Sequence, residues 1–141
     1  MKFNDFYLNE NEAEVGFLTD IEKDTNENTN FREVLWTGQL QLVLMALKPG
    51  EDIGEEIHEP DQFFRVDGGS GKLIIKDKEY EIKDGSAFII PGGTKHNIIA
   101  SDKGLKVYAI YAPPQHEDGT IHKTKEEAVA DEKEEHGENE E

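Results

Sequence analysis

Between residues 31 and 114 the chain alternates short apolar runs with polar punctuation. Each run is a handful of residues rich in Val, Ile, Phe and Tyr, and Gly, Pro, Asp or Asn stands at every junction. Runs of this kind are typical of strands joined by turns, and their regular succession is typical of an antiparallel sandwich or barrel. The predicted strands lie in FREVLW, QLQLVLMALK, QFFRVDGG, GKLIIKD, EYEIKDG, SAFIIPGG, HNIIASD and KVYAIYAPP.

Both ends of the chain lack this pattern. Residues 1–30 form an irregular N-terminal extension, in which LTDIEKDTNENTN predicts a short helix. Residues 115–141 predict a weak helix followed by a disordered acidic tail, DEKEEHGENEE. Thr124 and Glu127 have the spacing of a capping box, whereas the apolar face behind them is only Ala128, Val129 and Ala130. A length of 141 residues fits one domain, which we place at 31–114.

Charge and composition exclude several classes of function. The net charge is -17, which disfavours nucleic-acid binding because phosphate backbones need clustered Lys and Arg. The chain has no cysteine, so disulfides, thiolate metal sites and cysteine nucleophiles are excluded. Apolar runs fall far short of the roughly 20 residues that span a bilayer, and the N-terminus lacks the apolar core of a secretory signal. We therefore expect a cytoplasmic protein that binds neither nucleic acid nor membrane.

The stretch GEEIHEPDQFF carries the candidate chemistry. Side chains alternate across a strand, so Glu56 and His58 point to the same face. If the chain turns at residues 59–61, an antiparallel hairpin brings Gln62 opposite that pair. A second predicted hairpin turns through Gly92 and Gly93 and starts its next strand with His96.

These residues carry a resemblance to the cupin superfamily, which consists of double-stranded β-helix barrels of the jelly-roll type. The first cupin motif, G-x5-H-x-H-x3/4-E-x6-G, is matched in spacing by Gly50, Glu56, His58, Gln62 and Gly69. The second motif, G-x5-P-x-G-x2-H-x3-N, is matched by Gly85, Pro91, Gly93 and His96, with Ala100 where asparagine is usual. The resemblance implies an all-β jelly-roll barrel.

Carried over position by position, the resemblance implies a metal site formed by Glu56, His58, Gln62 and His96. Glu56 stands where the family has histidine, and Gln62 stands where it has glutamate. Two histidines with one carboxylate suit non-haem Fe(II), and two histidines with Glu and Gln also occur at the zinc site of cupin phosphomannose isomerases. One divalent ion per chain is expected, with Zn, Fe, Ni and Mn all open. The alternative is a metal-free polar pocket, which we disfavour because unpaired polar groups in a barrel interior cost about 1–3 kcal/mol each.

No general base stands beside these four residues in the sequence. His116, in the segment YAPPQHEDGTIHKT, is the one candidate, because this segment can fold over the barrel mouth. We favour the alternative that His116 and His122 are ordinary residues of an exposed loop. Arg65 and Lys95 are out of phase with Gln62 and His96 and should face outward, which weakens a phosphosugar substrate.

The site is compatible with three functions. The preferred one is a metal-dependent enzyme of the sugar isomerase or epimerase type, acting on a small oxygenated metabolite. An Fe(II)-dependent dioxygenase is the second, and a non-catalytic metal- or ligand-binding module is the third. The resemblance to small cupins, together with exposed edge strands such as FREVLW, also predicts a homodimer.

Overall fold

The computed structural model describes residues 15–137, whose strands and helices follow the predicted pattern with two mergers. QFFRVDGG and GKLIIKD form one long strand, and so do HNIIASD and KVYAIYAPP. The expected short helix before the first strand is present. The elements are α1 (Ile21–Glu27), β1 (Arg32–Thr37), β2 (Gln41–Leu47), β3 (Gln62–Ile75), β4 (Lys78–Lys83), β5 (Ala87–Ile90), β6 (His96–Tyr111), β7 (Ile121–His122) and α2 (Lys125–Gly137).

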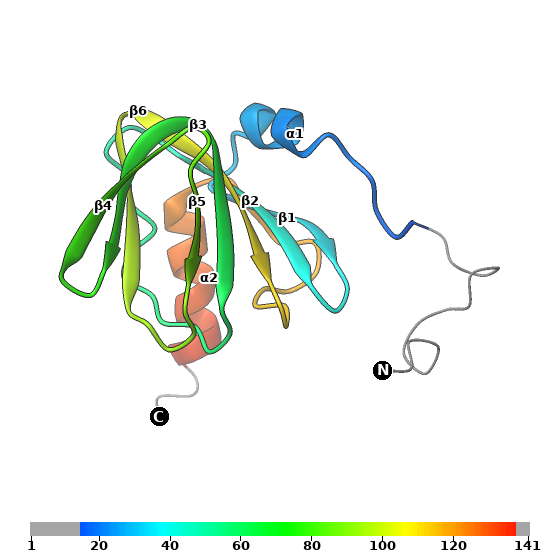
Figure 1. Cartoon of the computed structure of the whole chain (residues 1–141). Helices are drawn as coiled ribbons and strands as arrows, with labels where there is room; N and C mark the ends of the chain where they lie inside the picture. Colours follow the sequence, from blue (N-terminus) through cyan, green and yellow to red (C-terminus); the bar gives the residue numbers. More distant parts are fainter. Residues whose placement is uncertain (1–14, 138–141) are drawn as a thin grey trace, which may run out of the picture.

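All these strands belong to one antiparallel sheet that folds over on itself. The order is β4-β3-β6-β2-β1-β7, and β5 pairs with β3. Strands β3 and β6 run side by side from Gln62↔Tyr111 to Ile75↔His96. Figure 1 shows them bending at the top, with β4 on one side of the bend and β1 and β2 on the other. This is the predicted jelly-roll arrangement.

Glycines allow β3 to stay paired through the bend. The register shifts between Val66 and Gly68 and again between Gly69 and Gly71. Gly69 has a φ of 78°, and a Cβ there would lie 2.1 Å from the carbonyl oxygen of Gly104. A Cβ on Gly71 would lie 2.2 Å from the carbonyl oxygen of Ile99. Because a side chain has no room at either position, glycine lets the two long strands bend together.

The core lies between the two halves of the sheet. Alternate residues of each strand point inward, as the period of two requires. Val43, Phe64, Val66, Ile98 and Ala109 are at most 1% exposed. The inward row of β3 begins at Gln62 and that of β6 begins at His96, so both polar residues continue rows that are otherwise apolar.

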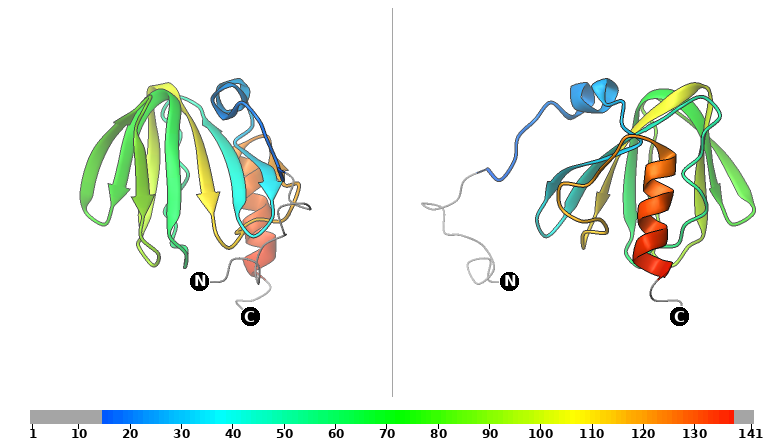
Figure 2. Two further views of the ribbon diagram at one scale, coloured as in Figure 1. Left: turned by 45° about the vertical axis from the view of Figure 1, so that its right-hand side comes forward. Right: turned by 180° about the vertical axis from the view of Figure 1, so that it is seen from behind.

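The C-terminal segment is more ordered than predicted. Residues 121–122 form β7, which pairs with β1 at Arg32↔His122, and α2 runs on to Gly137 although a disordered tail was expected from Asp131. Thr124 and Glu127 form the predicted capping box, and burial of Ala128 fixes the helix against the sheet. The right-hand view of Figure 2, seen from behind, shows α2 in front of the strands, so the helix covers the side of the sheet that faces away in Figure 1. The rest of the predicted tail, 138–141, and residues 1–14 lie outside the described residues.

No helix within residues 15–137 is long and apolar enough to cross a membrane.

Candidate functional site

Glu56 is positioned by pairing with His96, and the hairpin predicted between Glu56 and Gln62 is wrong. Each of Glu56 and His96 donates its backbone N–H to the other's carbonyl oxygen, at 3.0 Å in both directions. The chain after Glu56 is tied to the turn between β5 and β6, because Gly93 N–H donates to the carbonyl oxygen of His58 at 2.8 Å. The backbone of this segment therefore pairs with residues 93–96, and Gln62 instead stands opposite Tyr111 and Ile90.

Glu56 and His58 contact each other through their side chains. His58 Nε2 lies 2.9 Å from Glu56 Oε2, and Glu56 Oε1 lies 3.9 Å from Nη2 of Arg32. Burial raises the pKa of Glu56, but the hydrogen bond from His58 and the positive charges nearby outweigh it and leave this pKa below its ordinary value. The carboxylate is therefore ionised at neutral pH.

His96 presents an unpaired nitrogen to the interior. The side chain is 2% exposed, and its Nδ1 lies 2.9 Å from the carbonyl oxygen of Thr94. A carbonyl can only accept, so Nδ1 carries a proton and the Nε2 of the neutral ring carries the lone pair. This Nε2 is buried and has no hydrogen-bond partner among the described residues. An orienting hydrogen bond on one nitrogen and a free lone pair on the other are the features of a metal-ligating histidine.

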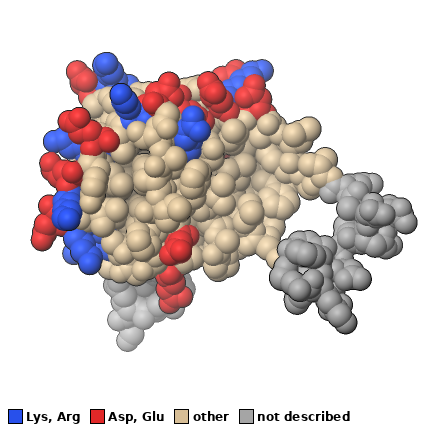
Figure 3. All heavy atoms as spheres, in the orientation of Figure 1, with Lys and Arg blue, Asp and Glu red and all other residues tan. Residues whose placement is uncertain are grey.

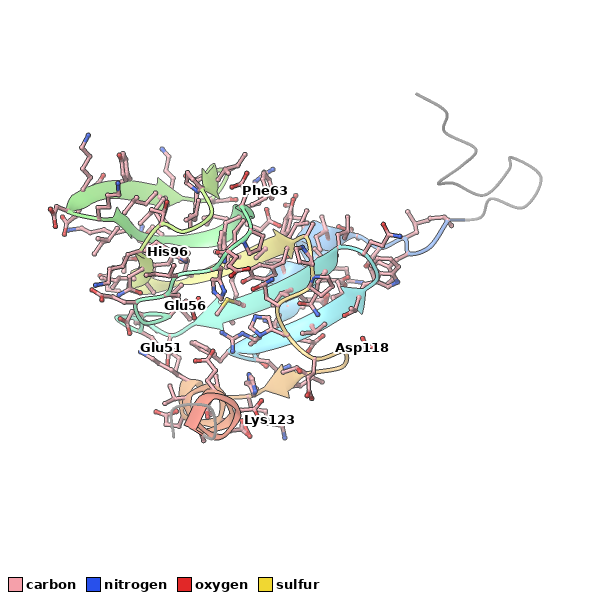
Figure 4. All side chains as sticks on the ribbon, turned by 90° about the horizontal axis from the view of Figure 1, so that it is seen from below. Glu51, Glu56, Phe63, His96, Asp118 and Lys123 are labelled. Carbon is pink, nitrogen blue, oxygen red and sulfur yellow. The ribbon has the colours of Figure 1, made fainter. Side chains whose placement is uncertain are left out.

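Gln62 is the second buried side chain without partners. It is also 2% exposed, and neither its Oε1 nor its Nε2 bonds to any group that the structure describes. Its backbone is in register with Tyr111, whose ring centroid lies 6.0 Å from that of His58. The ring centroids of His58 and His96 are 6.1 Å apart. Figure 4 shows Glu56 and His96 near the middle of the fold, with Asp118 and Lys123 farther out.

Glu56, His58 and His96 are therefore brought together, and Gln62 faces the same interior without a direct bond to them. Among the described side chains, no three histidine, aspartate or glutamate residues are already arranged to hold a metal ion. Glu56 and His58 are instead hydrogen-bonded to each other. The residue set nevertheless fits a divalent cation, because it joins one carboxylate, two imidazoles and an amide oxygen around buried atoms that have no protein partner.

The expectation that His116 and His122 are exposed loop residues is wrong. His122 is 7% exposed, and its Nε2 bonds to Asp131 Oδ2 at 2.8 Å. His116 is partly buried, its Nε2 has no partner in the described part of the chain, and its ring lies edge-on to Tyr111 with a centroid distance of 5.6 Å. The segment after β6 thus folds over the site, which was the interpretation we had disfavoured.

Gln41 holds His116 in place. This glutamine is fully buried at the start of β2, and no sequence pattern predicted a role for it. Its Nε2 donates to the carbonyl oxygen of His116 at 2.8 Å, and its Oε1 accepts from the backbone N–H groups of Gln115 and His116 at 3.1 and 3.0 Å. Both ends of the amide are therefore satisfied by the loop that carries His116.

Burial controls the protonation of two rings beside the site, the imidazole of His116 and the phenol of Tyr111. Burial, with the positive charge of Arg32 adding to it, lowers the pKa of His116 to about 3, so its imidazole is neutral at neutral pH. Burial, with the negative charge of Glu56 adding to it, raises the pKa of the Tyr111 phenol above its usual range. A neutral imidazole with an unpaired nitrogen can accept a proton, but a pKa of about 3 makes it a weak base.

Arg32 is a functional candidate that no sequence pattern indicated. It is 3% exposed, and its Nη1 lies 3.3 Å from His122 Nδ1 and 3.5 Å from Glu132 Oε1. Arg65 and Lys95 do face outward as predicted, at 40% and 60% side-chain exposure. The inward positive charge therefore comes from β1, whose Arg32 lies between Glu56 and the C-terminal helix.

Comparison with known proteins identifies the family. The cupin-domain family model matches residues 43–111, which include all four predicted ligands. This chain belongs to the cupin superfamily. It is 46% identical over 123 residues to the uncharacterized protein YrkC of Bacillus subtilis, covering 81% of this chain and 66% of YrkC. A crystal structure of BH2720 from Bacillus halodurans is 44% identical, covers 84% of this chain and 97% of that one, and superposes with a TM-score of 0.80.

A shorter likeness reaches a protein with a stated activity. The dimethylsulfoniopropionate lyase DddW of Ruegeria pomeroyi is 34% identical over 58 residues, which cover 41% of this cupin and 38% of DddW. Solved structures with less identity share the fold alone, as does KdgF from Halomonas sp. at 22% identity and a TM-score of 0.56.

Proposed function

We propose that this cupin is a metal-dependent enzyme of the isomerase or epimerase type, acting on a small oxygenated metabolite. Glu56, His58, Gln62 and His96 are the proposed ligands. The observation that carries the proposal is the set of buried polar atoms without partners, namely His96 Nε2 and both amide atoms of Gln62. Each such atom costs about 1–3 kcal/mol, and a bound cation is a common reason for a fold to keep them.

The chemistry of the four side chains supports a divalent ion. Neutral imidazole suits Zn, Fe, Ni and Mn alike, and the glutamate supplies a negative charge to offset the cation. The metal identity therefore stays open. A divalent ion held there would polarise a carbonyl or hydroxyl oxygen of the substrate.

His116 supports proton transfer as the reaction type. Isomerisation and epimerisation need a group that accepts a proton from carbon, and the sequence offered none beside the ligands. The position of His116 supports this role, because its Nε2 is buried and carries no other hydrogen bond to described groups, whereas its pKa of about 3 makes the ring a weak base. The partial likeness to a lyase supports an enzyme over a binding module.

Metal titration of paired variants tests the ligand set. Zn(II) and Fe(II) would be titrated by calorimetry into the metal-free full chain. We expect Glu56→Gln to weaken binding by more than the roughly 10- to 100-fold typical of losing an outer partner of a ligand. Gln62→Glu should keep or tighten binding, because it adds a carboxylate, while lowering the Lewis acidity of the bound ion.

Substitutions at two exposed positions, Glu55 and Gln39, provide the matched controls. Glu55→Gln makes the same change at a side chain that is 67% exposed, and Gln39→Glu adds the same charge on the surface. Both should leave the binding constants unchanged. If Glu56→Gln binds metal like the wild type while Gln62→Glu abolishes binding, the assigned ligand roles are wrong.

The reaction class is tested on the metal-loaded protein. Incubation with hydroxy aldehydes, ketones and acids in D₂O should exchange a carbon-bound hydrogen for deuterium, detected by NMR, and His116→Gln should abolish the exchange while metal binding persists. Iron in the purified protein together with O₂ uptake on a catechol or diketone would instead favour the Fe(II) dioxygenase, for which two histidines and one carboxylate are suited. Ligand binding without turnover would favour the binding module.

A further inference from the structure

One edge of the Arg32 guanidinium is not used by the fold. Nη1 is committed to His122 on β7 and to Glu132 on α2. Nε is buried and has no hydrogen-bond partner within the described structure, and Nη2 is 3.9 Å from Glu56 Oε1, too far for a hydrogen bond. The N–H of Nε and one N–H of Nη2 point in parallel from the same side of the planar group.

The hydrogen-bond donors and the positive charge on this edge determine which ligand it can bind. Every guanidinium nitrogen donates and none accepts, so the buried Nε needs an acceptor atom. Two parallel N–H groups match the two oxygens of a carboxylate in spacing and in charge. We propose that this edge of Arg32 binds the carboxylate of the substrate, which narrows the substrate to a small hydroxy or oxo acid.

The space beside Arg32 fits a small molecule. A cavity of about 260 Å³ adjoins it, and its lining includes His116, the proposed proton acceptor. A carboxylate on Arg32 would thus lie near His116, whereas Glu56 does not line this cavity and is 3.9 Å from Nη2 of Arg32. This placement suits an acid whose reacting carbon is next to the carboxylate.

Four acidic residues near Arg32 oppose the binding of an anion, namely Asp131, Glu132, Glu117 and Glu56. Asp131 bonds to His122, and Glu132 contacts Nη1, so both carboxylates are already paired, although both also line the cavity. Glu117 lines the cavity but is exposed, where its charge is screened. Glu56 lies beside Nη2, on the edge of Arg32 that makes no hydrogen bond. A bound cation would offset the charge of Glu56, so the inference rests on the proposed function.

The chain contains a matched control for an NMR test. Arg32 and Arg65 are its two arginines, so a ¹H–¹⁵N spectrum of the arginine side chains contains two Nε–H signals. Arg65 is 40% exposed, and its Nε, which also has no hydrogen-bond partner among the described groups, is 3.5 Å from Asp67 Oδ1, away from the site. The Arg65→Lys variant assigns the signals. The Zn(II)-loaded full chain would be titrated with glycolate and, as a neutral match, with ethylene glycol.

We expect glycolate to shift the Arg32 signal and leave that of Arg65 in place. Glycolate should bind roughly 10- to 100-fold tighter than ethylene glycol, the range of a hydrogen bond to a charged group. Arg32→Lys keeps the positive charge but loses the pair of parallel N–H groups, and Arg32→Met loses both the charge and the N–H groups. Both variants should bind glycolate more weakly than the wild type does and ethylene glycol with unchanged affinity, whereas Arg65→Lys should bind both probes like the wild type.

The result that overturns the inference differs from the one that overturns the proposed function. If the wild type binds Zn(II) but shows no preference for glycolate and no shift at Arg32, the carboxylate site is refuted and the metal site stands. If the wild type binds no divalent metal, the proposed function is refuted, and glycolate added to the metal-free chain still tests Arg32. Both comparisons use the wild type, so they do not depend on the folding of an Arg32 variant.

Discussion

Burial sets the protonation state of His116, and this has a consequence for stability. The pKa of its imidazole falls from an ordinary 6.5 to about 3 in the folded chain. Between these values the unfolded chain binds a proton at His116 and the folded chain does not. The contribution of His116 to the free energy of unfolding is therefore at its maximum above about pH 6.5, and it decreases as the pH falls toward 3.

We predict that His116→Gln flattens the acid side of the stability profile. At pH 5 the wild type should have lost up to about 2 kcal/mol relative to pH 7 through this group, because one pKa unit corresponds to about 1.4 kcal/mol. Urea unfolding at several pH values between 5 and 7 measures the difference between variant and wild type. This range avoids the titration of Glu56, whose lowered pKa confines its effect to more acidic solutions. Parallel profiles for the two proteins would show that His116 is solvated in the folded state.

Local sequence signals explain which site residues could be predicted. Glu56, His58, Gln62 and His96 follow from motif spacing, since strand alternation and turn glycines fix side-chain direction over a few residues. Arg32 follows from no local pattern. The groups it contacts on β7 and α2 lie 90 and 100 positions along the chain, and only the folded C-terminal segment brings them together. Gln41 was missed for the same reason, because its partners are 74 and 75 positions away.

At the level of elements, local sequence patterns determine where the strands form, whereas long-range contacts determine the structure of the C-terminal segment. The apolar runs predicted strand positions well, but they split β3 and β6 in two, because glycine reads as a turn when it in fact permits a bend within a strand. The C-terminal segment was predicted to form only a weak helix before a disordered acidic tail. It folds because His122, Ala128 and Arg32 are buried together, a gain that its own composition does not show.

The loop after β6 gives a prediction at this scale. Gln41→Leu removes the amide that bonds to Gln115 and His116, so we expect their backbone N–H groups to exchange with solvent much faster. Stability should fall by about 2–4 kcal/mol, since buried backbone groups lose their partners. Hydrogen exchange followed by NMR measures both amides against those of β2 and β6, which should be unaffected. Gln39→Leu, on an exposed neighbour, is the control. Unchanged exchange at His116 would mean that other contacts hold the loop.

At the scale of the whole molecule, charge and apolar surface are separated. The chain carries a net charge of -17, yet Figure 3 shows a broad area without charged residues over β5, β3, β2 and β1. Outward-facing side chains of these strands and β6 are large and apolar. Phe17, which is 39% exposed, stacks on Trp36, and Phe63 lies against Tyr108. The apolar outer face consists of Phe17, Trp36, Leu40, Leu42, Phe63, Ile89, Tyr108 and Ile110.

We predict that two copies of the chain pair through this apolar outer face. A contiguous apolar area is unusual on a monomer, and strong like charge elsewhere on the surface would keep two copies apart unless they met on an uncharged face. Sedimentation at micromolar concentration should therefore give twice the 16.0 kDa of one chain. Trp36→Glu and Leu42→Glu should each shift the mass to that of a single chain, because a dimer would bury two carboxylates without partners. Val129→Glu, at a 50% exposed position on α2, is the matched control and should leave the dimer intact. A wild-type mass of one chain would refute the pairing, whereas a dimer that survives both substitutions would place the interface on another face.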